Sequence, residues 1–174
     1  SITGKDQIGA LVGFKRQGML TVSNCYSTGS VTGTNSNAGG LVGHLRDGIA
    51  LSNCYSTCTV NGDDGVGGLV GYLKNESNLV NCYSTGSVTG SGINVGGLIG
   101  WLQHSTASVS NCYSTGSVTG SSGSVGGLVG VTTNGATASN SFWDTQTSGQ
   151  SSSAAGTGKT TAEMQIASTF TNAG

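Results

Sequence analysis

The chain of 174 residues repeats itself about every 29 residues, and this period limits the folds open to it more than any other feature. The phrase Asn-Cys-Tyr-Ser-Thr begins at Asn24, Asn53, Asn81 and Asn111, and a degenerate copy, Asn-Ser-Phe-Trp, begins at Asn140. A second phrase, Gly-Gly-Leu-Val-Gly, begins at Gly39, Gly67 and Gly126, with variants at Gly9 and Gly96. A fixed period of about 20 to 50 residues indicates stacked structural units, as in solenoids and propellers.

Each unit has the pattern of β structure. Residues 25–32 alternate and are rich in β-branched and small side chains, whereas the glycine pair Gly39-Gly40 opposes a helix. A propeller blade needs about 40 residues, and the dense leucine pattern of a leucine-rich repeat is missing. We therefore predict an all-β chain, a β-solenoid (parallel β-helix) of about five 29-residue coils with a short C-terminal capping segment.

The repeats and the tail divide the chain near residue 146. Residues 1–146 contain the coils, which begin near residues 1, 30, 59, 87 and 117. Residues 147–174 form a Ser/Gly-rich segment followed by a short helical cap, since Thr160 and Glu163 make a capping box. We expect one helix there with Ala162, Ile166 and Phe170 on one face.

The two ends of the stack need different explanations. A stack of coils exposes a sheet edge at each end, and exposed edges promote aggregation unless they are covered. We expect Phe142, Trp143 and the C-terminal helix to cover the last coil. The amino end has no comparable cover, and we expect the polypeptide to continue upstream.

In-register stacking places equivalent side chains about 4.8 Å apart, so that weakly apolar positions join into continuous columns. The expected core columns are Val31, Val60, Val88 and Val118; Leu41, Leu69, Leu98 and Leu128; and Val22, Leu51, Leu79 and Val109. A column at a corner should contain Asn24, Asn53, Asn81, Asn111 and Asn140. We expect each of these amides to bond its neighbour and the turning backbone, so that leucine there would leave buried turn amides unpaired.

Four cysteines share one position of the repeat, Cys25, Cys54, Cys82 and Cys112, and Cys58 stands where other copies have glycine. The chain has no Cys-x-x-Cys pair and its histidines lie in other registers, which opposes a zinc site. Side chains of in-register parallel strands point the same way, which disfavours the dihedral angle of a disulfide. We expect a column of free, buried thiols, with the regularity of the second coil in doubt at Cys58.

The outward face should be a regular array of hydroxyl groups. If Val31 points inward, its neighbours point outward, and the candidate binding surface comprises Thr28, Ser30, Thr32, Thr57, Thr59, Thr85, Ser87, Thr89, Thr115, Ser117 and Thr119. A bulge at Gly29 would instead turn Tyr26 and Thr28 inward, and the residues leave both arrangements open. Such an array resembles the faces with which unrelated solenoids bind ice, but β-branched residues also suit any exposed strand.

Two further rows lie side by side on another part of each coil. Arg16, Arg46 and Lys74 align, with Gln103 continuing the row, and we expect these charges to face solvent. Phe14, His44, Tyr72 and Trp101 form a mostly aromatic row, either exposed to stack on sugars or partly buried. We expect His44 and His104 to be ordinary surface residues.

Enzymatic sites and charged partners find little support. The acidic residues fall at different coil positions, and Asp63-Asp64 lie in a turn where solvation is expected, with weak calcium binding as the alternative. We expect no catalytic residue, no metal site and no cofactor. A charged fraction of 7% and a net charge of −1 oppose nucleic-acid binding, and no apolar run approaches the roughly 20 residues of a membrane span.

The two phrases in fixed order, Gly-Gly-Leu-Val-Gly and Asn-Cys-Tyr-Ser-Thr-Gly-Ser-Val-Thr-Gly, resemble the GLUG-motif repeats of large bacterial surface proteins. Residues 142–145 and 156–164 resemble the segments that close such arrays. The resemblance implies an extracellular, cell-surface module without catalytic residues: a stalk, an adhesin segment or a filament subunit. Its partners would be other segments of a longer surface protein or identical subunits end to end. Ice binding through the hydroxyl array is the alternative function, and a carbohydrate-binding surface is the second alternative.

Overall fold

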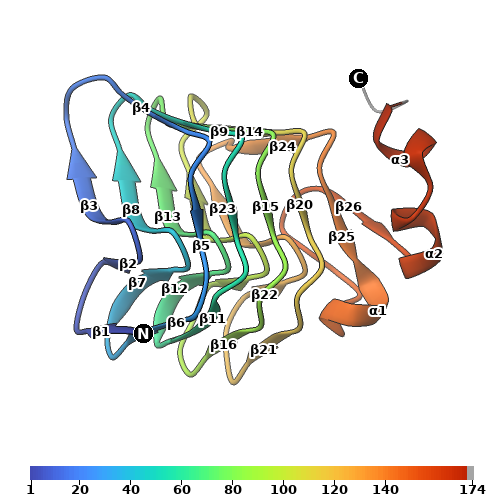
Figure 1. Ribbon diagram of the computed structural model, residues 1–174, viewed down its shortest axis with the longest axis horizontal. Coiled ribbons are helices and arrows are strands. Elements are labelled where there is room, and N and C mark those ends of the chain that lie inside the picture. The colour runs from blue at the N-terminus through green and yellow to red at the C-terminus, as the bar shows by residue number, and fades with distance from the viewer. Residues whose placement is uncertain (172–174) are drawn as a thin grey trace.

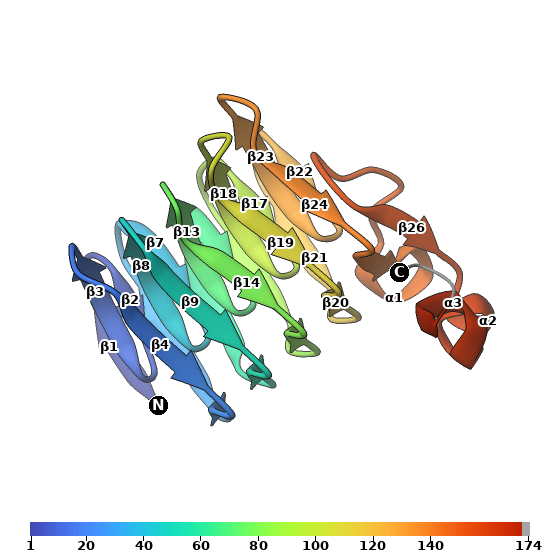
Figure 2. The ribbon, with the colours of Figure 1, turned by 90° about the horizontal axis from the view of Figure 1, so that it is seen from above.

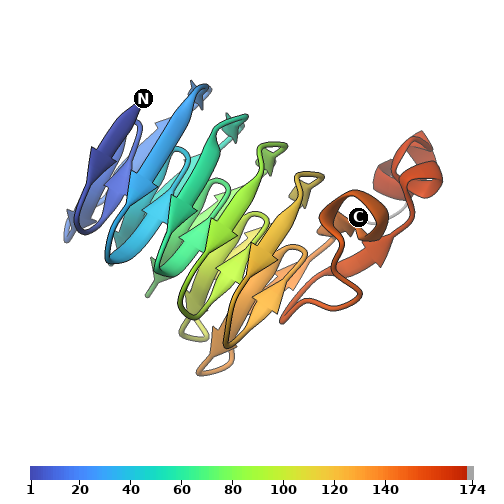
Figure 3. The same cartoon turned by 90° about the horizontal axis from the view of Figure 1, so that it is seen from below.

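The structure, a computed structural model, describes residues 1–171 and is a β-solenoid (Figure 1). Five stacked coils each pass once through five short strands, and equivalent strands of successive coils form five parallel sheets. This architecture confirms the predicted all-β solenoid of five coils. Figures 2 and 3 show the coils following one another along a single axis, with the helices gathered at the C-terminal end.

We name the sheets A to E in the order in which each coil enters them. Sheet A contains β1 (Ile2–Gly4), β6 (Ser30–Gly33), β11 (Thr59–Gly62), β16 (Val88–Gly90) and β21 (Val118–Gly120). Sheet B contains β2 (Ile8–Gly9), β7 (Ser36–Gly39), β12 (Asp64–Gly67), β17 (Val95–Gly96) and β22 (Val125–Gly126). Sheet C contains β3 (Val12–Arg16), β8 (Val42–Arg46), β13 (Val70–Lys74), β18 (Ile99–Gln103) and β23 (Val129–Thr133).

The remaining two sheets complete each coil. Sheet D contains β4 (Leu20–Ser23), β9 (Ile49–Ser52), β14 (Asn78–Val80), β19 (Ser108–Ser110) and β24 (Thr137–Ser139). Sheet E contains β5 (Tyr26–Ser27), β10 (Tyr55–Ser56), β15 (Tyr83–Ser84), β20 (Tyr113–Ser114), β25 (Phe142–Asp144) and β26 (Thr157–Lys159). The helices are α1 (Thr145–Ser148), α2 (Thr161–Met164) and α3 (Ala167–Thr171), and no helix within residues 1–171 has the length and hydropathy needed to cross a membrane.

The register places like residues beside like residues. In sheet A, Val60 pairs with both Val31 and Val88, and Val88 also pairs with Val118. The extra cysteine does not disturb this pattern, because β11 begins directly after Cys58 and keeps the same register to both neighbours. Its thiol is fully buried beside the valine column.

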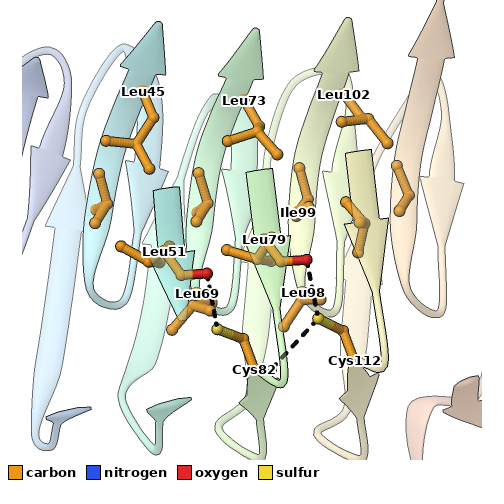
Figure 4. Packing of buried hydrophobic residues seen from close by; sticks show 14 of the residues in the cluster. Leu45, Leu51, Leu69, Leu73, Leu79, Cys82, Leu98, Ile99, Leu102 and Cys112 are labelled. Atoms are coloured by element: carbon orange, nitrogen blue, oxygen red, sulfur yellow. Dashed lines mark hydrogen bonds between the residues drawn. The ribbon is translucent and has the colours of Figure 1, made fainter. Parts of the chain in front are cut away.

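The core consists of two compartments. The larger one lies among sheets C, D and the start of E, and it contains the leucine columns and Cys54, Cys82 and Cys112 (Figure 4). The smaller one contains the valine column of sheet A together with Ala38, Val66 and Val95 of sheet B. The two compartments meet where Gly40 lies against Ser56 across the coil. The contact is so close that a Cβ atom at Gly40 would clash with the Ser56 hydroxyl. The repeated serine of the first phrase thus faces the repeated glycine of the second phrase across the interior.

The first glycine of the Gly-Gly-Leu-Val-Gly phrase is explained by close approach of backbones. A Cβ atom at Gly39 would clash with the Val42 carbonyl oxygen and with the Gly71 nitrogen of the next coil. The same clash recurs at Gly67 and Gly96. The phrase therefore marks the point where the chain turns tightly from sheet B into sheet C.

The C-terminal end of the stack is covered by non-repetitive sequence. Trp143 is buried, and its indole ring fills the space where a side chain at Gly127 would lie. The Ser/Gly-rich segment continues this cover: the Gly127 N–H donates to the Ser152 carbonyl (3.0 Å) and the Val129 N–H donates to the Ser153 hydroxyl (2.8 Å). With β26 paired to β25, this segment forms a partial further coil.

The expected single C-terminal helix is wrong. The capping box is present, since the Thr160 N–H donates to Glu163 Oε2 (2.8 Å) and the Glu163 N–H donates to Thr160 Oγ1 (3.2 Å). The helix nevertheless ends at Met164, because the Ile166 N–H bonds three residues back to the Glu163 carbonyl (3.1 Å), a tightened turn. Of the expected face, Phe170 on α3 reaches the solenoid, where its ring contacts Tyr113 and Phe142.

Candidate functional surface

The outward face alternates strictly, which settles the question that Gly29 leaves open. In the second coil, Cys54, Ser56, Cys58 and Val60 are all fully buried. The residues between them are exposed or half-buried and point outward: Tyr55, Thr57, Thr59 and Asn61. Gly29, at the position of Cys58, is exposed with a φ of 103°, but Ser27 and Val31 on either side are buried and pair with Ser56 and Val60 without an added residue. Tyr26 and Thr28 therefore face outward.

The candidate hydroxyl residues form one surface, here called the hydroxyl array. Of its members, Thr28, Thr57, Thr59, Thr85, Ser87, Thr89, Ser117 and Thr119 are exposed, whereas Ser30, Thr32 and Thr115 are half-buried. They lie in three columns along the axis, and register extends the third column to Thr3, which sequence reasoning omitted, with Asn61 as its second-coil member.

Hydrogen bonds between coils continue between sheets E and A under the hydroxyl array. The Thr57 N–H donates to the Ser27 carbonyl, and the Thr85 N–H donates to the Ser56 carbonyl, each at 3.0 Å. The Thr59 N–H donates to the Gly29 carbonyl at 2.9 Å. The threonine column is therefore held at the strand spacing, although its residues lie between two assigned strands.

A column of tyrosines borders the array. Tyr26, Tyr55, Tyr83 and Tyr113 stack with ring centroids 4.8 to 5.2 Å apart and nearly parallel planes. Phe170 closes the column at the C-terminal end, with its ring centroid 5.7 Å from that of Tyr113. Because the ring faces lie against one another, the column presents mainly ring edges and hydroxyl groups to solvent.

The aromatic row of sheet C is partly buried, and the expectation that His44 is an ordinary surface residue is wrong. His44 is 8% exposed and lies between the rings of Phe14 (4.8 Å) and Tyr72 (4.4 Å), and the Tyr72 ring stacks in turn on Trp101. Neither ring nitrogen of His44 bonds another group within residues 1–171, and burial lowers the pKa of this imidazole to about 4. The stacked faces leave little for a sugar ring to contact. His104, by contrast, is exposed.

The basic row beside it carries its own counter-charge. Asp47 accepts from Arg46 (Nε–Oδ2 3.1 Å) and from Asn75 (Nδ2–Oδ1 2.9 Å), and Arg16 lies 4.0 Å away. The Asn75 hydrogen bond and the arginine charges hold the pKa of Asp47 below its usual value. Sequence reasoning missed this acid, because the row was aligned without the turn that follows it.

The cysteine column has a structural role that its spacing did not indicate. The Cys54 N–H points at the Cys82 sulfur at 3.4 Å. The Cys82 N–H points at the Cys112 sulfur, also at 3.4 Å (Figure 4). In the fifth coil Ser141 replaces cysteine and accepts the Cys112 N–H at 3.1 Å. All the cysteines are free thiols, and burial raises the pKa of Cys54 to about 11. The sulfur atoms therefore satisfy backbone donors at a corner.

The asparagine column marks that corner but does not form the expected chain of amides. All five residues have left-handed backbone, with φ between 47° and 55°, and their side chains are exposed. Within residues 1–171 one amide–amide bond is present, from Asn81 Nδ2 to Asn53 Oδ1 (3.3 Å). The corner backbone is satisfied between coils instead, as when the Asn53 N–H donates to the Val80 carbonyl (3.1 Å). Asparagine is placed here by the left-handed φ angle, which it tolerates better than most residues.

The acidic residues do not converge on one site. Asp63 and Asp64 are bonded by the next coil, through the Ser91 hydroxyl (2.8 Å) and the Ile93 N–H (2.7 Å). Asp144 caps α1 by accepting from the Gln146 N–H (2.9 Å). Within residues 1–171 there is no pocket and no group of three His, Cys, Asp or Glu side chains arranged to hold a metal ion.

Comparisons with known proteins agree with this architecture. Residues 62–89 and 91–119 match the family described as the GLUG motif. A comparison with curated proteins finds no match. The fold is similar to the crystal structure of a protein described as a "putative immunoglobulin A1 protease" from Bacteroides ovatus, with 22% identity and a TM-score of 0.59. The alignment covers 82% of this chain and 51% of that structure, so the chain spans about half of its length.

Proposed function

We propose that this chain, which carries GLUG-motif repeats, is a rigid, non-enzymatic module of a bacterial cell-surface protein, in which the solenoid forms a segment of stalk. The observation that carries the proposal is the continuity of the stack. Consecutive backbone bonds run along the axis from Leu41 to Leu69 (3.0 Å), from Leu69 to Leu98 (3.0 Å) and from Leu98 to Leu128 (2.9 Å). The same residues form a fully buried side-chain column.

This continuity suits a spacer. Each coil makes its contacts with its immediate neighbours, so that length grows with the number of repeats while the cross-section stays constant. Close-packed cores resist compression, which favours a stiff element over a flexible linker.

The non-enzymatic part of the proposal is supported by the chemistry of the surface. Apart from the exposed Glu76, the described acids are engaged in turns, caps and an ion-pair cluster, and the thiols are directed into backbone hydrogen bonds. The GLUG phrases themselves are explained by packing. The protease description belongs to the Bacteroides ovatus protein, of which the aligned part is about half.

Identical subunits stacked end to end are not favoured as partners. The last coil is covered by Trp143, β26 and the Ser152–Ser153 backbone, so the C-terminal end presents no repeat coil on which a second copy could stack. The proposed partners are other segments of a longer surface protein.

Pulsed electron paramagnetic resonance tests the stalk. Thr21 and Thr137 lie in one outward column of sheet D, separated by four coil steps through Ala50, Asn78 and Ser108. Spin labels attached there through non-natural amino acids should give one narrow distribution of label-to-label distances centred at about 19 Å, because each step adds about 4.8 Å.

The control is the same labelled chain in denaturant, which should give a broad distribution. A broad distribution in native buffer would contradict a rigid stalk. Incubation with immunoglobulin A1, peptides and a glycan panel should give no turnover, and turnover that persists in the purified chain would contradict the non-enzymatic assignment.

A further inference from the structure

The hydroxyl array has features that a stalk does not require, and we propose that it binds the surface of ice. This function goes beyond the structural role, and neither depends on the other. The first observation is the state of the hydroxyl groups. Within residues 1–171, none of the eleven side-chain hydroxyls of the array makes a hydrogen bond to another protein group.

Elsewhere on the surface some hydroxyl groups are bonded within the protein, whereas others, such as those of Thr21 and Thr137 in sheet D, are not bonded within residues 1–171. The Ser91 hydroxyl donates to Asp63 (2.8 Å), the Ser108 hydroxyl donates to Asn78 (2.7 Å), and Thr106 accepts from the Glu76 N–H (2.9 Å). What distinguishes the array is that all eleven of its hydroxyl groups remain free for water on one continuous surface.

The second observation is two-dimensional regularity. Along the axis, Thr32, Asn61 and Thr89 are in register, so that members of a column repeat at the strand spacing of about 4.8 Å. Along each coil, strict alternation places successive members two residues apart, about 6.6 to 6.8 Å. Because the backbone bonds between coils hold the spacing along the axis, the columns are fixed before any ligand arrives, and little entropy is lost on binding.

This regularity indicates the kind of ligand. Waters held by hydroxyl groups at repeating positions form an ordered layer, and ordered waters can bridge two surfaces nearly as well as direct hydrogen bonds. A ligand that repeats in two dimensions and consists of hydrogen-bonded water can continue that layer. Ice has both properties.

Other occupants fit the array less well. A protein partner needs aromatic or aliphatic anchors that fill pockets, and no pocket exists within residues 1–171. A nucleic acid or an acidic glycan needs cations, and no member of the array is charged. A neutral sugar would stack on open aromatic faces, but the bordering rings of Tyr55 and Tyr83 lie against each other (4.8 Å).

The test uses the chain as it is, with ice as the probe. The wild-type chain should shape ice crystals and open a gap between their melting and growth temperatures. Thr85→Tyr, in the threonine column of the array, should remove most of this gap, because a bulky ring disrupts the ordered layer. Thr57→Tyr, in the neighbouring coil, should act in the same way and guards against one variant failing to fold.

The matched control is Thr137→Tyr, the same change at an exposed threonine of sheet D. It should keep the wild-type gap, and circular dichroism should show all three variants folded. Absence of the gap and of crystal shaping in the wild type would overturn the proposal. An equal loss of the temperature gap in Thr85→Tyr and Thr137→Tyr would overturn it as well. Binding of the wild-type chain to crystalline polysaccharide in place of ice would have the same consequence. None of these outcomes alters the distance that tests the stalk.

Discussion

The first coil and the inner coils share one sequence pattern but differ in burial. Leu11 and Leu41 hold the same position of the Gly-Gly-Leu-Val-Gly phrase, yet Leu11 is 51% exposed and Leu41 is fully buried. The difference arises because Leu41 has a coil on each side and Leu11 has a coil on one side only. The comparison teaches that a repeat position has no fixed burial of its own: the neighbouring coils supply it.

The last coil shows the other solution to the same problem. Its core column ends at Leu128, which is fully buried although no complete coil follows it. Non-repetitive residues take the place of the missing neighbour, with Trp143 and Ala155 packed into the core cluster. The C-terminal end is thus closed by a changed sequence.

A buried charge should give the largest difference in stability between a change in an inner coil and the same change in the first coil. Val88→Asp places a carboxylate in the fully enclosed valine column and should unfold the central coils, because an unpaired buried charge is very costly. Ile2→Asp changes the same column in the first coil, where the side chain is 39% exposed, and should leave the fold intact. Circular dichroism and urea unfolding measure both.

The outward control for this experiment is Thr89→Asp, which should be tolerated because Thr89 is exposed. If Val88→Asp and Thr89→Asp unfold the chain equally, the inward and outward assignment is wrong.

Truncation of a leucine should give a graded difference. Leu69→Ala in an inner coil should cost about 2 to 5 kcal/mol of unfolding free energy, the usual range for a buried leucine. Leu11→Ala should cost less than about 1 kcal/mol, because half of that side chain is already in water. Equal losses in chemical denaturation would mean that burial does not depend on the neighbouring coil.

The cysteine column offers a smaller contrast of the same kind. Cys82→Ala removes the sulfur that accepts the Cys54 N–H and should cost about 1 to 3 kcal/mol, the range for an unsatisfied buried donor. Cys82→Ser should recover part of this, since Ser141 takes the same role in the fifth coil. No N–H within residues 1–171 donates to the Cys25 sulfur, so Cys25→Ala should be nearly neutral. A larger loss at Cys25 than at Cys82 would contradict the assigned role.

Acid should act through His44, which is buried in an inner coil. The pKa of this imidazole is lowered from its ordinary value of 6.5 to about 4. Burial is the main cause, the charges of Arg46 and Lys74 act in the same direction, and the charge of Asp47 acts against them. Between pH 6.5 and 4 the unfolded chain therefore binds more protons than the folded chain. The free energy of unfolding should keep its full value above pH 6.5 and decrease as the pH falls towards 4. Urea midpoints measured at several pH values should show this decline.

His44→Phe should flatten that dependence between pH 6.5 and 4. The aspartates with lowered pKa, such as Asp47, lose their contribution below their ordinary value of 3.8, and Glu163 loses its contribution below its ordinary value of 4.5. The part of the interval above pH 4.5 therefore reports on His44. A decline of equal size in His44→Phe would assign the effect to another group.

The fold was predictable from the sequence because phrase spacing fixes register directly: Asn24, Asn53 and Asn81 can share a corner only if each unit closes one coil. The direction of Thr28 was not predictable, since Gly29 permits both a bulge and an extended backbone. The structure decides it through Cys58, whose buried side chain marks the glycine position as inward. The burial of His44 depends on its stacking between Phe14 and Tyr72 from adjacent coils, and alignment of the repeats does not reveal that packing.

The cap was predictable in part. The capping box at Thr160 is a local pattern and is present. The contribution of Ser152 and Ser153 was not predictable, because they bond backbone groups of the last coil more than 20 residues earlier in the chain. A Ser/Gly-rich stretch has no periodicity from which such a contact could be inferred.

Scalar couplings across hydrogen bonds, measured by NMR on the isotopically labelled chain, test the register most directly. The Tyr83 N–H should couple to the Cys54 carbonyl carbon, and the Tyr113 N–H to that of Cys82, across the 3.1 Å bonds that join successive coils. Couplings at these separations of one repeat would establish that each unit closes a coil on the next. Couplings confined within one unit, as in hairpins or helices, would contradict the solenoid and everything derived from it.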